Sequence, residues 1–214
     1  ASERPVSEYY IHNLAGGKVK TLDLSTIHHH DTEWCDAVLR RKMDSWLAER
    51  VHEKCSETGG GLLTDVRVNG LLREDGDIVG VTCDEIDPIR ADVILAADGV
   101  NSELAREAGL MDWDDPDEWF QGVKAVVDMD PDAIDERFGV DPDDGVAHLF
   151  SGDLFEGVRG GGFLYTNEDS LSIGTVFHLD SLAERRAEPH ELLDALLTHP
   201  LLDRWLDGEY EERE

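Results

Sequence analysis

The chain has few cysteines and no long hydrophobic run. Its three cysteines, Cys35, Cys55 and Cys83, stand far apart in 214 residues, and none belongs to a CxxC pair. This spacing gives no iron–sulfur or zinc motif and indicates reduced thiols in a cytoplasmic protein. No apolar run reaches the roughly 18 residues of a membrane-spanning helix, and no secretory leader is recognisable. We therefore expect no transmembrane segment and no metal site.

Basic residues are also scarce. The chain has 19 Lys and Arg against 49 Asp and Glu, a formal net charge of −30 at pH 7. This balance argues against nucleic acid or an anionic membrane surface as an electrostatic partner. Because the acids are spread along the chain, a disordered acidic tail is not indicated. The pattern favours a halophile-type acidic surface over an ordinary acidic protein, and it predicts unfolding at low salt.

The strongest motif present is residues 91–110, ADVILAADGVNSELAREAGL. Residues 93–97 read as a buried strand, Asp98-Gly99 as a sharp turn, and residues 102–110 as a helix capped by Asn101-Ser102. Such a turn at the carboxyl end of a strand is where open α/β folds bind ligands. The Asp98 carboxylate can accept a hydrogen bond from a ligand hydroxyl, and Gly99 lets the backbone approach closely.

The first half of the chain predicts an α/β arrangement. The expected elements are a hairpin of residues 9–14 and 18–24 around Gly16-Gly17, a strand at 35–39, a helix at 40–57 ended by Gly59–Gly61, and strands at 62–64, 66–74, 78–84 and 89–97. In the helix, Met43, Trp46, Leu47 and Val51 follow helical spacing and are expected in the core. His28–His30 are expected in a surface loop, with metal binding as the alternative.

The second half predicts an antiparallel sheet. An acidic connector, residues 112–118, marks the boundary between domains 1–115 and 116–214. Beyond it we expect strands at 121–128, 146–150, 161–166 and 171–178, a helix at 131–138, and two helices within 189–206 separated at Pro200. The fold class is therefore α/β plus antiparallel β.

Three stretches carry a family resemblance. The Asp98-Gly99 motif resembles the second flavin fingerprint of FAD-dependent oxidoreductases related to aromatic hydroxylases. Residues 38–48, VLRRKMDSWLA, and 160–167, GGGFLYTN, resemble segments of the FixC and electron-transfer-flavoprotein–quinone oxidoreductase family, in that family's order. The resemblance implies a partial FAD-binding domain of the aromatic-hydroxylase/glutathione-reductase type (1–115) and an antiparallel-sheet substrate domain (116–214).

The resemblance also implies roles for particular residues at a flavin. Asp98 would accept a hydrogen bond from the ribityl chain of FAD, and Gly99 would let the backbone lie against the cofactor. Arg40 matches an arginine near the flavin, or it pairs with one of the many carboxylates. Val68 matches a strand beside the adenine, or it is an ordinary strand valine. A plain turn that caps a helix is the alternative for Asp98-Gly99.

A second set of residues is implied at the quinone. In the family that this chain resembles, the glycines that match Gly161 and Gly162 lie at the quinone head group. Phe163 and Tyr165 share one face of their strand and Leu164 faces the other. Lys124 faces either the substrate cavity or a surface carboxylate. The alternative for the glycines is a bulge or bend at a strand start.

No strand–GxGxxG–helix unit, which holds the FAD pyrophosphate in such enzymes, is present in the sequence. We therefore expect an internal fragment of a haloarchaeal-type enzyme that is inactive alone. By resemblance, the intact enzyme passes electrons from an electron-transfer flavoprotein through FAD toward a quinone, with a ferredoxin-like subunit and, as an open question, peripheral contact with the inner face of the cell membrane. The alternatives are a geranylgeranyl-lipid reductase and a non-catalytic domain whose flavin site has lapsed.

Overall fold

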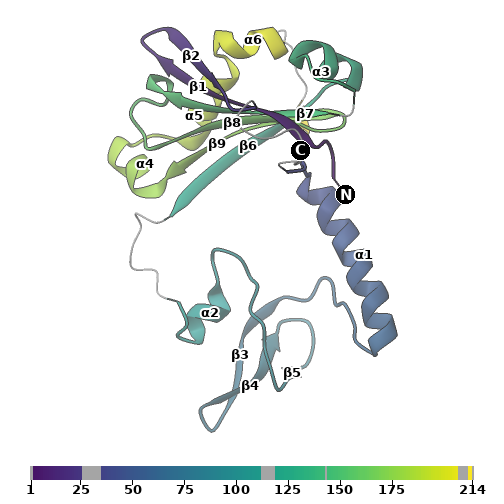
Figure 1. Cartoon of the computed structure of the whole chain (residues 1–214). Helices are drawn as coiled ribbons and strands as arrows, with labels where there is room; N and C mark the ends of the chain where they lie inside the picture. The colour runs from purple at the N-terminus through teal and green to yellow at the C-terminus, as the bar shows by residue number, and fades with distance from the viewer. Residues whose placement is uncertain (1, 26–34, 112–118, 143, 207–211, 214) are drawn as a thin grey trace. The chain divides into compact units, whose positions relative to one another are not determined.

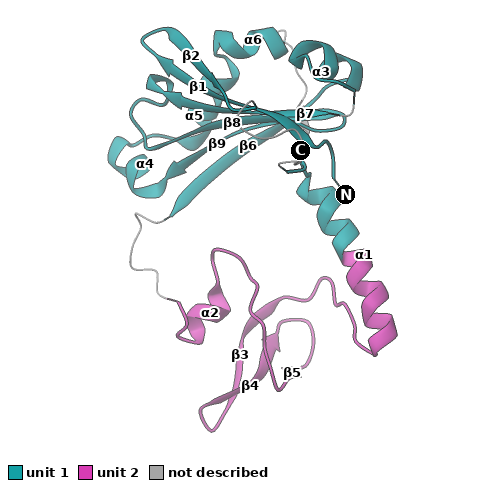
Figure 2. Cartoon of the chain, viewed as in Figure 1, with its two compact units in different colours: residues 1–47, 116–214 teal, residues 48–115 magenta. Residues whose placement is uncertain are grey.

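The computed structural model describes residues 2–25, 35–111, 119–142, 144–206 and 212–213 (Figure 1). The chain divides into two compact units (Figure 2). Unit 1 contains residues 1–47 and 116–214, and unit 2 contains residues 48–115. The histidine run at 28–30 and the acidic connector at 112–118 lie outside the described residues.

Unit 1 is built on a seven-stranded sheet with the order β10-β6-β9-β8-β7-β1-β2. Its strands are β1 (Val6–Ala15), β2 (Lys18–Asp23), β6 (Phe120–Asp128), β7 (Gly145–Gly152), β8 (Gly160–Thr166), β9 (Ser170–His178) and β10 (Glu212–Arg213). Every neighbouring pair is antiparallel except β1 and β7, which are parallel. The antiparallel sheet predicted for the second half of the chain is confirmed for β6, β9, β8 and β7. The parallel neighbour of β7 was not predicted, because the distant segment β1 supplies it.

Local turn signals in unit 1 gave the correct hairpin. β1 and β2 pair around Gly16 and Gly17, whose φ values of 60° and 69° suit a tight hairpin turn. The strand predicted at 35–39 is wrong as a regular strand. Only an isolated bridge between Pro5 and Asp36 forms there, and the Ala37 N–H donates a backbone hydrogen bond to the Arg4 carbonyl beside it.

The helices of unit 1 are α3 (Pro131–Phe138), α4 (Leu179–Arg185), α5 (Pro189–Leu197) and α6 (Pro200–Leu206). The helix predicted at 131–138 and the break at Pro200 are confirmed, whereas α4 was not predicted. Asp130 caps α3 by accepting a hydrogen bond from the Asp132 N–H at 3.0 Å, and Gly139 ends it in the left-handed conformation. Both ends of α3 are therefore specified by local sequence.

The core of unit 1 lies between one sheet face and the helices. Leu164 of β8 and Leu196 of α5 are both fully buried there. Other fully buried members are Val127, Ile134, Leu171, Ile173, Phe177 and Leu202. Each such side chain contributes about 1.5–3 kcal/mol through burial, so this face fixes the orientation of every strand that carries one.

Helix α1 (Arg40–Thr58) begins and ends as predicted, and Gly59 follows it with φ 77°. The prediction that its apolar stripe is core is wrong in the described structure. No residue of α1 is buried, and Trp46 and Leu47 are 47% and 50% exposed. The spacing produces an apolar stripe, but no described element covers it.

Unit 2 has a three-stranded antiparallel sheet of β3 (Val68–Glu74), β4 (Asp77–Cys83) and β5 (Ile89–Arg90). The turn at Asp75-Gly76 is confirmed, with φ values of 51° and 95°. The predicted strand at 62–64 is not formed. The predicted buried strand at 93–97 is also wrong, since the strand ends at Arg90 and Val93 and Leu95 are 75% and 88% exposed. No described neighbour forms a ladder with this segment.

The two units differ from the predicted domains in the first 47 residues. The division near residue 115 falls at a unit boundary, but residues 1–47 cluster with the second half of the chain. The reason is the parallel pairing of β1 with β7, which joins the first strand to the sheet of residues 120–178. The assignment of flavin and substrate roles to parts of the chain remains a prediction.

Candidate functional site

The sheet of unit 1 has one face that its core helices do not cover. Along β8, Leu164 is buried in the core, whereas Phe163 and Tyr165 lie on the opposite face with their rings 5.6 Å apart and nearly parallel. The predicted alternation is confirmed. We call this opposite surface, which includes Tyr9, Leu149, Phe163 and Tyr165, the open face.

One hollow on the open face has a volume of about 400 Å³. We call it the tyrosine hollow; it is lined by, among others, Tyr9, Cys35, Asp36, Val38, Phe163 and Tyr165. Burial raises the pKa of Tyr9, and the neighbouring Cys35 adds to the rise. At neutral pH the Tyr9 hydroxyl is therefore a neutral hydrogen-bond donor beside an apolar space.

A second hollow of about 340 Å³ adjoins the first. We call it the glycine hollow; its lining includes Ile11, Leu149, Gly161, Gly162, Phe163 and Val176. Leu149 and Phe163, which face each other across β7 and β8, line both hollows. Three of the four predicted quinone residues on β8 therefore meet at one hollow, and Phe163 and Tyr165 meet at the other.

The two glycines have different packing environments. A Cβ on Gly162 would lie 2.6 Å from Leu196 Cδ2, which is in the core. A Cβ on Gly161 would lie 2.4 Å from the Phe150 carbonyl oxygen. Close packing thus requires glycine at both positions even without a ligand, and their backbone atoms are what they offer to the hollow.

Lys124 of β6 is exposed and occupies the same open face. It pairs in register with Gly174 of β9, which in turn pairs with Phe163. A Cβ on Gly174 would lie 2.4 Å from Phe163 Cζ, so the Phe163 ring extends over this glycine toward β6. The structure therefore brings Lys124 into one row with Phe163.

The Asp98-Gly99 turn of unit 2 differs in detail from the prediction. Asp98 Oδ2 accepts a hydrogen bond from the Leu104 N–H at 3.1 Å and so caps α2 (Glu103–Glu107). The predicted caps are wrong: Ser102 makes no side-chain cap and its hydroxyl donates to the Gly99 carbonyl. The reason is the left-handed backbone of Ser102, which turns its side chain back to the turn.

This turn fits a cofactor such as FAD. Asp98 is exposed and uses one oxygen as a cap, which leaves its other oxygen to accept from a ribityl hydroxyl. Gly99 has φ 78°, and no atom lies within 4 Å of the position that its Cβ would take. A ligand can therefore lie directly against this backbone, which makes Asp98 and Gly99 the residues that would hold it.

The two remaining predicted flavin residues have ordinary surroundings. Arg40 is exposed and forms a two-pronged ion pair with Asp44, with N–O distances of 2.9 and 3.0 Å. The hydrogen bonds that Arg40 donates to the Asp44 carboxylate raise the pKa of Arg40. Val68 begins β3, pairs with Cys83 and is exposed. Roles for Arg40 and Val68 at a flavin stay predictions.

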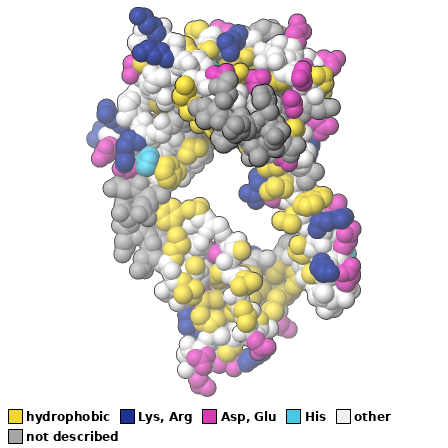
Figure 3. Space-filling model, in the orientation of Figure 1, with side chains coloured by type: hydrophobic (Ala, Val, Ile, Leu, Met, Phe, Trp, Pro, Cys, Tyr) yellow, Lys and Arg dark blue, Asp and Glu magenta, His cyan; other side chains and the backbone are white. Residues whose placement is uncertain are grey.

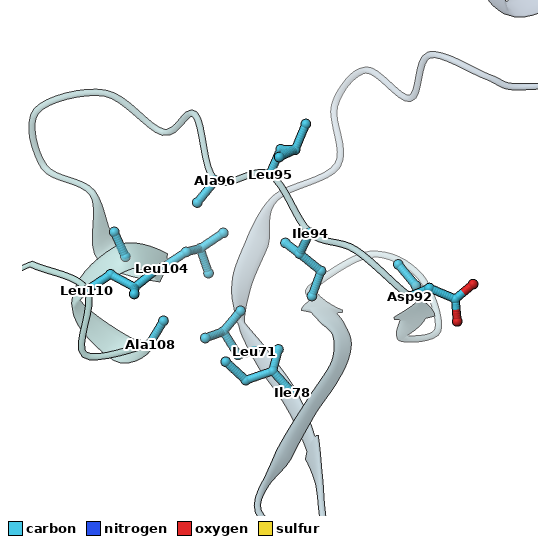
Figure 4. A pocket seen from close by; sticks show the side chains of 11 residues that line it. Leu71, Ile78, Asp92, Ile94, Leu95, Ala96, Leu104, Ala108 and Leu110 are labelled. Carbon is cyan, nitrogen blue, oxygen red and sulfur yellow. The ribbon is translucent and has the colours of Figure 1, made fainter.

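Unit 2 also has an apolar hollow of about 410 Å³ (Figure 4). Leu71 and Ile78 come from its sheet, Leu104 from α2, and Ile94 from the irregular segment after β5. Figure 4 shows these side chains around one space. Figure 3 shows hydrophobic side chains gathered on the surface of this unit. The residues predicted as a buried strand thus line an open apolar surface.

Sequence reasoning missed a buried histidine pair in unit 1. His12 Nε2 and His148 Nδ1 lie 2.9 Å apart, and His12 Nδ1 lies 2.9 Å from Thr21 Oγ1. The His148 ring lies 4.4 Å from that of Trp205. Burial, with a smaller effect from the Arg204 charge, lowers the pKa of His12 to about 4. Alternation with apolar neighbours on β1 and β7 was the available sequence signal.

His148 has the stronger shift of the two. Burial lowers its pKa to about 3, with further lowering by His12 and Arg204. The pair is therefore neutral at pH 7 and acts as part of the core between the sheet and α6. Among the residues that the structure describes, no group of three or more His, Cys, Asp or Glu could hold a metal ion. None of the described helices is long and apolar enough to cross a bilayer.

Solved structures with a similar fold include a flavin-dependent enzyme, the brominase Bmp2, which matches the whole chain over 49% of its own length with a TM-score of 0.60 and 14% identity. A geranylgeranyl bacteriochlorophyll reductase-like protein from Thermoplasma acidophilum matches the whole chain over 49% of its own length, with a TM-score of 0.71 and 20% identity. PqsL from P. aeruginosa matches the whole chain over 56% of its length, with a TM-score of 0.61 and 14% identity. The chain therefore has part of the fold of FAD-dependent oxidoreductases, and the predicted fold class is confirmed at this level.

Sequence relatives define the family. The chain is 37% identical over 171 residues to the probable electron transfer flavoprotein-quinone oxidoreductase YdiS of Escherichia coli and 40% identical over 172 residues to protein FixC of Shigella flexneri. Each match covers 80% of this chain. Over this region the chain belongs to the FixC and electron-transfer-flavoprotein–quinone oxidoreductase family, which confirms the resemblance. No protein-family model matches the chain. The chain spans 39% of the length of these relatives.

Proposed function

We propose that this chain is part of an FAD-dependent oxidoreductase that passes electrons from an electron-transfer flavoprotein toward a quinone. The observation that carries the proposal is its identity of 37–40% to YdiS and FixC. The open face supports it, because two adjoining hollows there are lined by apolar side chains, aromatic rings and glycine backbone. A flat quinone ring suits such surroundings.

The flavin, when bound, would supply the electron chemistry, and the chain's own residues would bind and orient. Asp98 would accept a hydrogen bond from the ribityl chain, and Gly99 would leave room for close approach. Gly161, Gly162 and Phe163 would hold the quinone ring, with Tyr165 stacked against Phe163. An electron-transfer flavoprotein and a ferredoxin-like subunit would be the protein partners, by analogy with FixC.

A geranylgeranyl-lipid reductase is the second candidate. The geranylgeranyl bacteriochlorophyll reductase-like structure has a TM-score of 0.71 to this chain. The tyrosine and glycine hollows share Leu149 and Phe163, so movement of these two side chains would join them into one longer apolar space. A long isoprenoid chain would need such a space.

The test uses a longer protein that contains this chain together with a nucleotide-binding segment. Its flavin is reduced without oxygen and mixed either with a short-chain quinone or with an unsaturated geranylgeranyl lipid, and the flavin absorbance is followed. Reoxidation by quinone alone supports the proposal. Reoxidation by lipid alone transfers the assignment to the reductase, and failure to take up FAD indicates a lapsed flavin site.

A further inference from the structure

The open face has almost no acidic residues, although the protein carries 49 Asp and Glu. Strand register places one row of side chains across six strands, in the order Leu22, Ile11, Leu149, Phe163, Gly174 and Lys124. A parallel row contains Tyr9, Ala147, Tyr165, Ser172 and Val126. Among these described positions none is Asp or Glu. These central rows therefore carry no carboxylate, whereas Asp128, two residues after Val126 on β6, adds one at the end of the same face.

The two hollows differ in charge. Asp36 is exposed and lines the tyrosine hollow, so a carboxylate stands at that end of the open face. The lining of the glycine hollow contains no Asp or Glu. An anionic ligand would be repelled by Asp36 in the tyrosine hollow and meets no such carboxylate in the glycine hollow.

Lys124 provides a positive charge beside the glycine hollow. It lies two strand intervals from Phe163, about 10 Å between Cα atoms at the usual strand spacing. Gly174 between them has no side chain, so nothing from β9 separates the lysine stem from the Phe163 ring. A flexible four-carbon stem can bring the ammonium group over one such interval. Among the described residues Lys124 has no salt bridge that would hold it elsewhere.

We propose that the glycine hollow selects the anionic form of a flat quinone-type ring, with Lys124 as the specificity-determining positive charge. This inference rests on the proposed function and adds to it the charge state of the bound ring. The ring stacks on Phe163 and covers Gly161, while its negative charge, spread over the ring oxygens, faces the Lys124 ammonium. Deprotonated ring forms are retained in preference to neutral ones, whatever the oxidation state of the ring.

The test uses the 214-residue chain and two matched ligands. 2,3-Dimethyl-1,4-naphthoquinone is neutral, and 2-hydroxy-3-methyl-1,4-naphthoquinone is an anion at neutral pH. Both have their reactive ring positions blocked, so they do not add to the thiols of Cys35, Cys55 or Cys83. Binding is measured by calorimetry at the lowest KCl concentration that leaves the circular dichroism spectrum unchanged, because salt screens the effect.

The anion is expected to bind about fivefold more tightly than the neutral ligand. Lys124→Gln should remove this preference and leave the affinity for the neutral ligand unchanged, whereas Lys124→Arg should retain it. Lys20→Gln makes the same change of charge on the same face, at the opposite edge of the sheet, and should keep the preference.

Two outcomes would overturn the proposal. The first is equal binding of both ligands by the unaltered chain, and the second is a preference for the anion that survives Lys124→Gln. Either result would show that Lys124 does not select the anion. The proposed quinone site would still stand, because the neutral ligand binds in both cases. Absence of binding by either ligand would remove the quinone site itself, and with it the support that the open face gives to the proposed function.

Discussion

Unit 1 and unit 2 bury their hydrophobic residues to different extents. Every buried hydrophobic side chain in the described part of the chain, from Val6 to Leu206, belongs to unit 1. Unit 2 instead exposes Val93, Leu95 and Leu110 almost completely. The sequence around Val93 is as strand-like as that of β9, but no described strand pairs with it. Apolar sequence therefore forms a buried strand only where a neighbour completes the hydrogen-bonded ladder.

The largest expected effect separates the two units directly. Leu164→Ala removes a fully buried side chain from the core of unit 1 and should lower the free energy of unfolding by about 2–5 kcal/mol. Leu95→Ala removes an exposed side chain and should change it by less than about 0.5 kcal/mol. Urea unfolding measures both. An equal loss in the two variants would show that Leu95 is packed in solution.

The buried histidine pair predicts that unit 1 is sensitive to acid. The pKa values of His12 and His148 in the folded chain, about 4 and 3, lie below the usual value of 6.5. At a pH between these values and 6.5, the unfolded chain therefore binds more protons than the folded chain. Stability is then fully present above pH 6.5 and is lost as the pH falls toward 4, by an amount on the order of 3 kcal/mol for each histidine. Urea unfolding followed by far-ultraviolet circular dichroism at a series of pH values reports this loss.

His148→Phe is the variant that tests this prediction, because it keeps an aromatic ring next to Trp205 but cannot bind a proton. It should reduce the slope of stability against pH between 6.5 and 4. His190→Gln changes an exposed histidine outside this pair and serves as the matched control. A slope that is the same in His148→Phe and the unaltered chain would exclude the pair as its cause.

Packing at the glycine hollow predicts a smaller effect. Gly162→Ala would place a Cβ 2.6 Å from Leu196 Cδ2 and 3.2 Å from Phe155 Cζ, and overpacking of this kind costs about 1–3 kcal/mol. Gly61→Ala in unit 2 has no atom within 4 Å of the new Cβ and should be close to neutral. Thermal unfolding compares the two. If Gly162→Ala lowered the unfolding temperature no more than Gly61→Ala, then α5 would move freely over β8.

The smallest expected effect concerns the cap of α2. Asp98→Ala removes the acceptor for the Leu104 N–H and should destabilise α2 by about 0.5–2 kcal/mol. Ser102→Ala removes no cap and should have less effect on the helix. Amide hydrogen exchange of residues 103–107 distinguishes them. Faster exchange in Ser102→Ala than in Asp98→Ala would reverse the assignment of the cap.

Local signals were sufficient for many elements. The turns at Gly16-Gly17 and Asp75-Gly76, the helix between Asp130 and Gly139, and the break at Pro200 were all predicted, because each depends on backbone conformation and hydrogen bonds within a few residues. The candidate site could be predicted in part from the sequence, because the alternation of Phe163, Leu164 and Tyr165 between the two faces follows from the strand period alone.

Tertiary structure decided what depends on distant partners. The parallel pairing of β1 with β7 joins residues more than 130 positions apart, which no local pattern specifies. That pairing brings His12 to His148, and the register of β6, β9 and β8 places Lys124 in the row of Phe163. The chain's own sequence determined its acidity, its turns, its helix ends and its family. Long-range strand register decided which side chains share a face, because a shift by one residue would turn each of them to the other side.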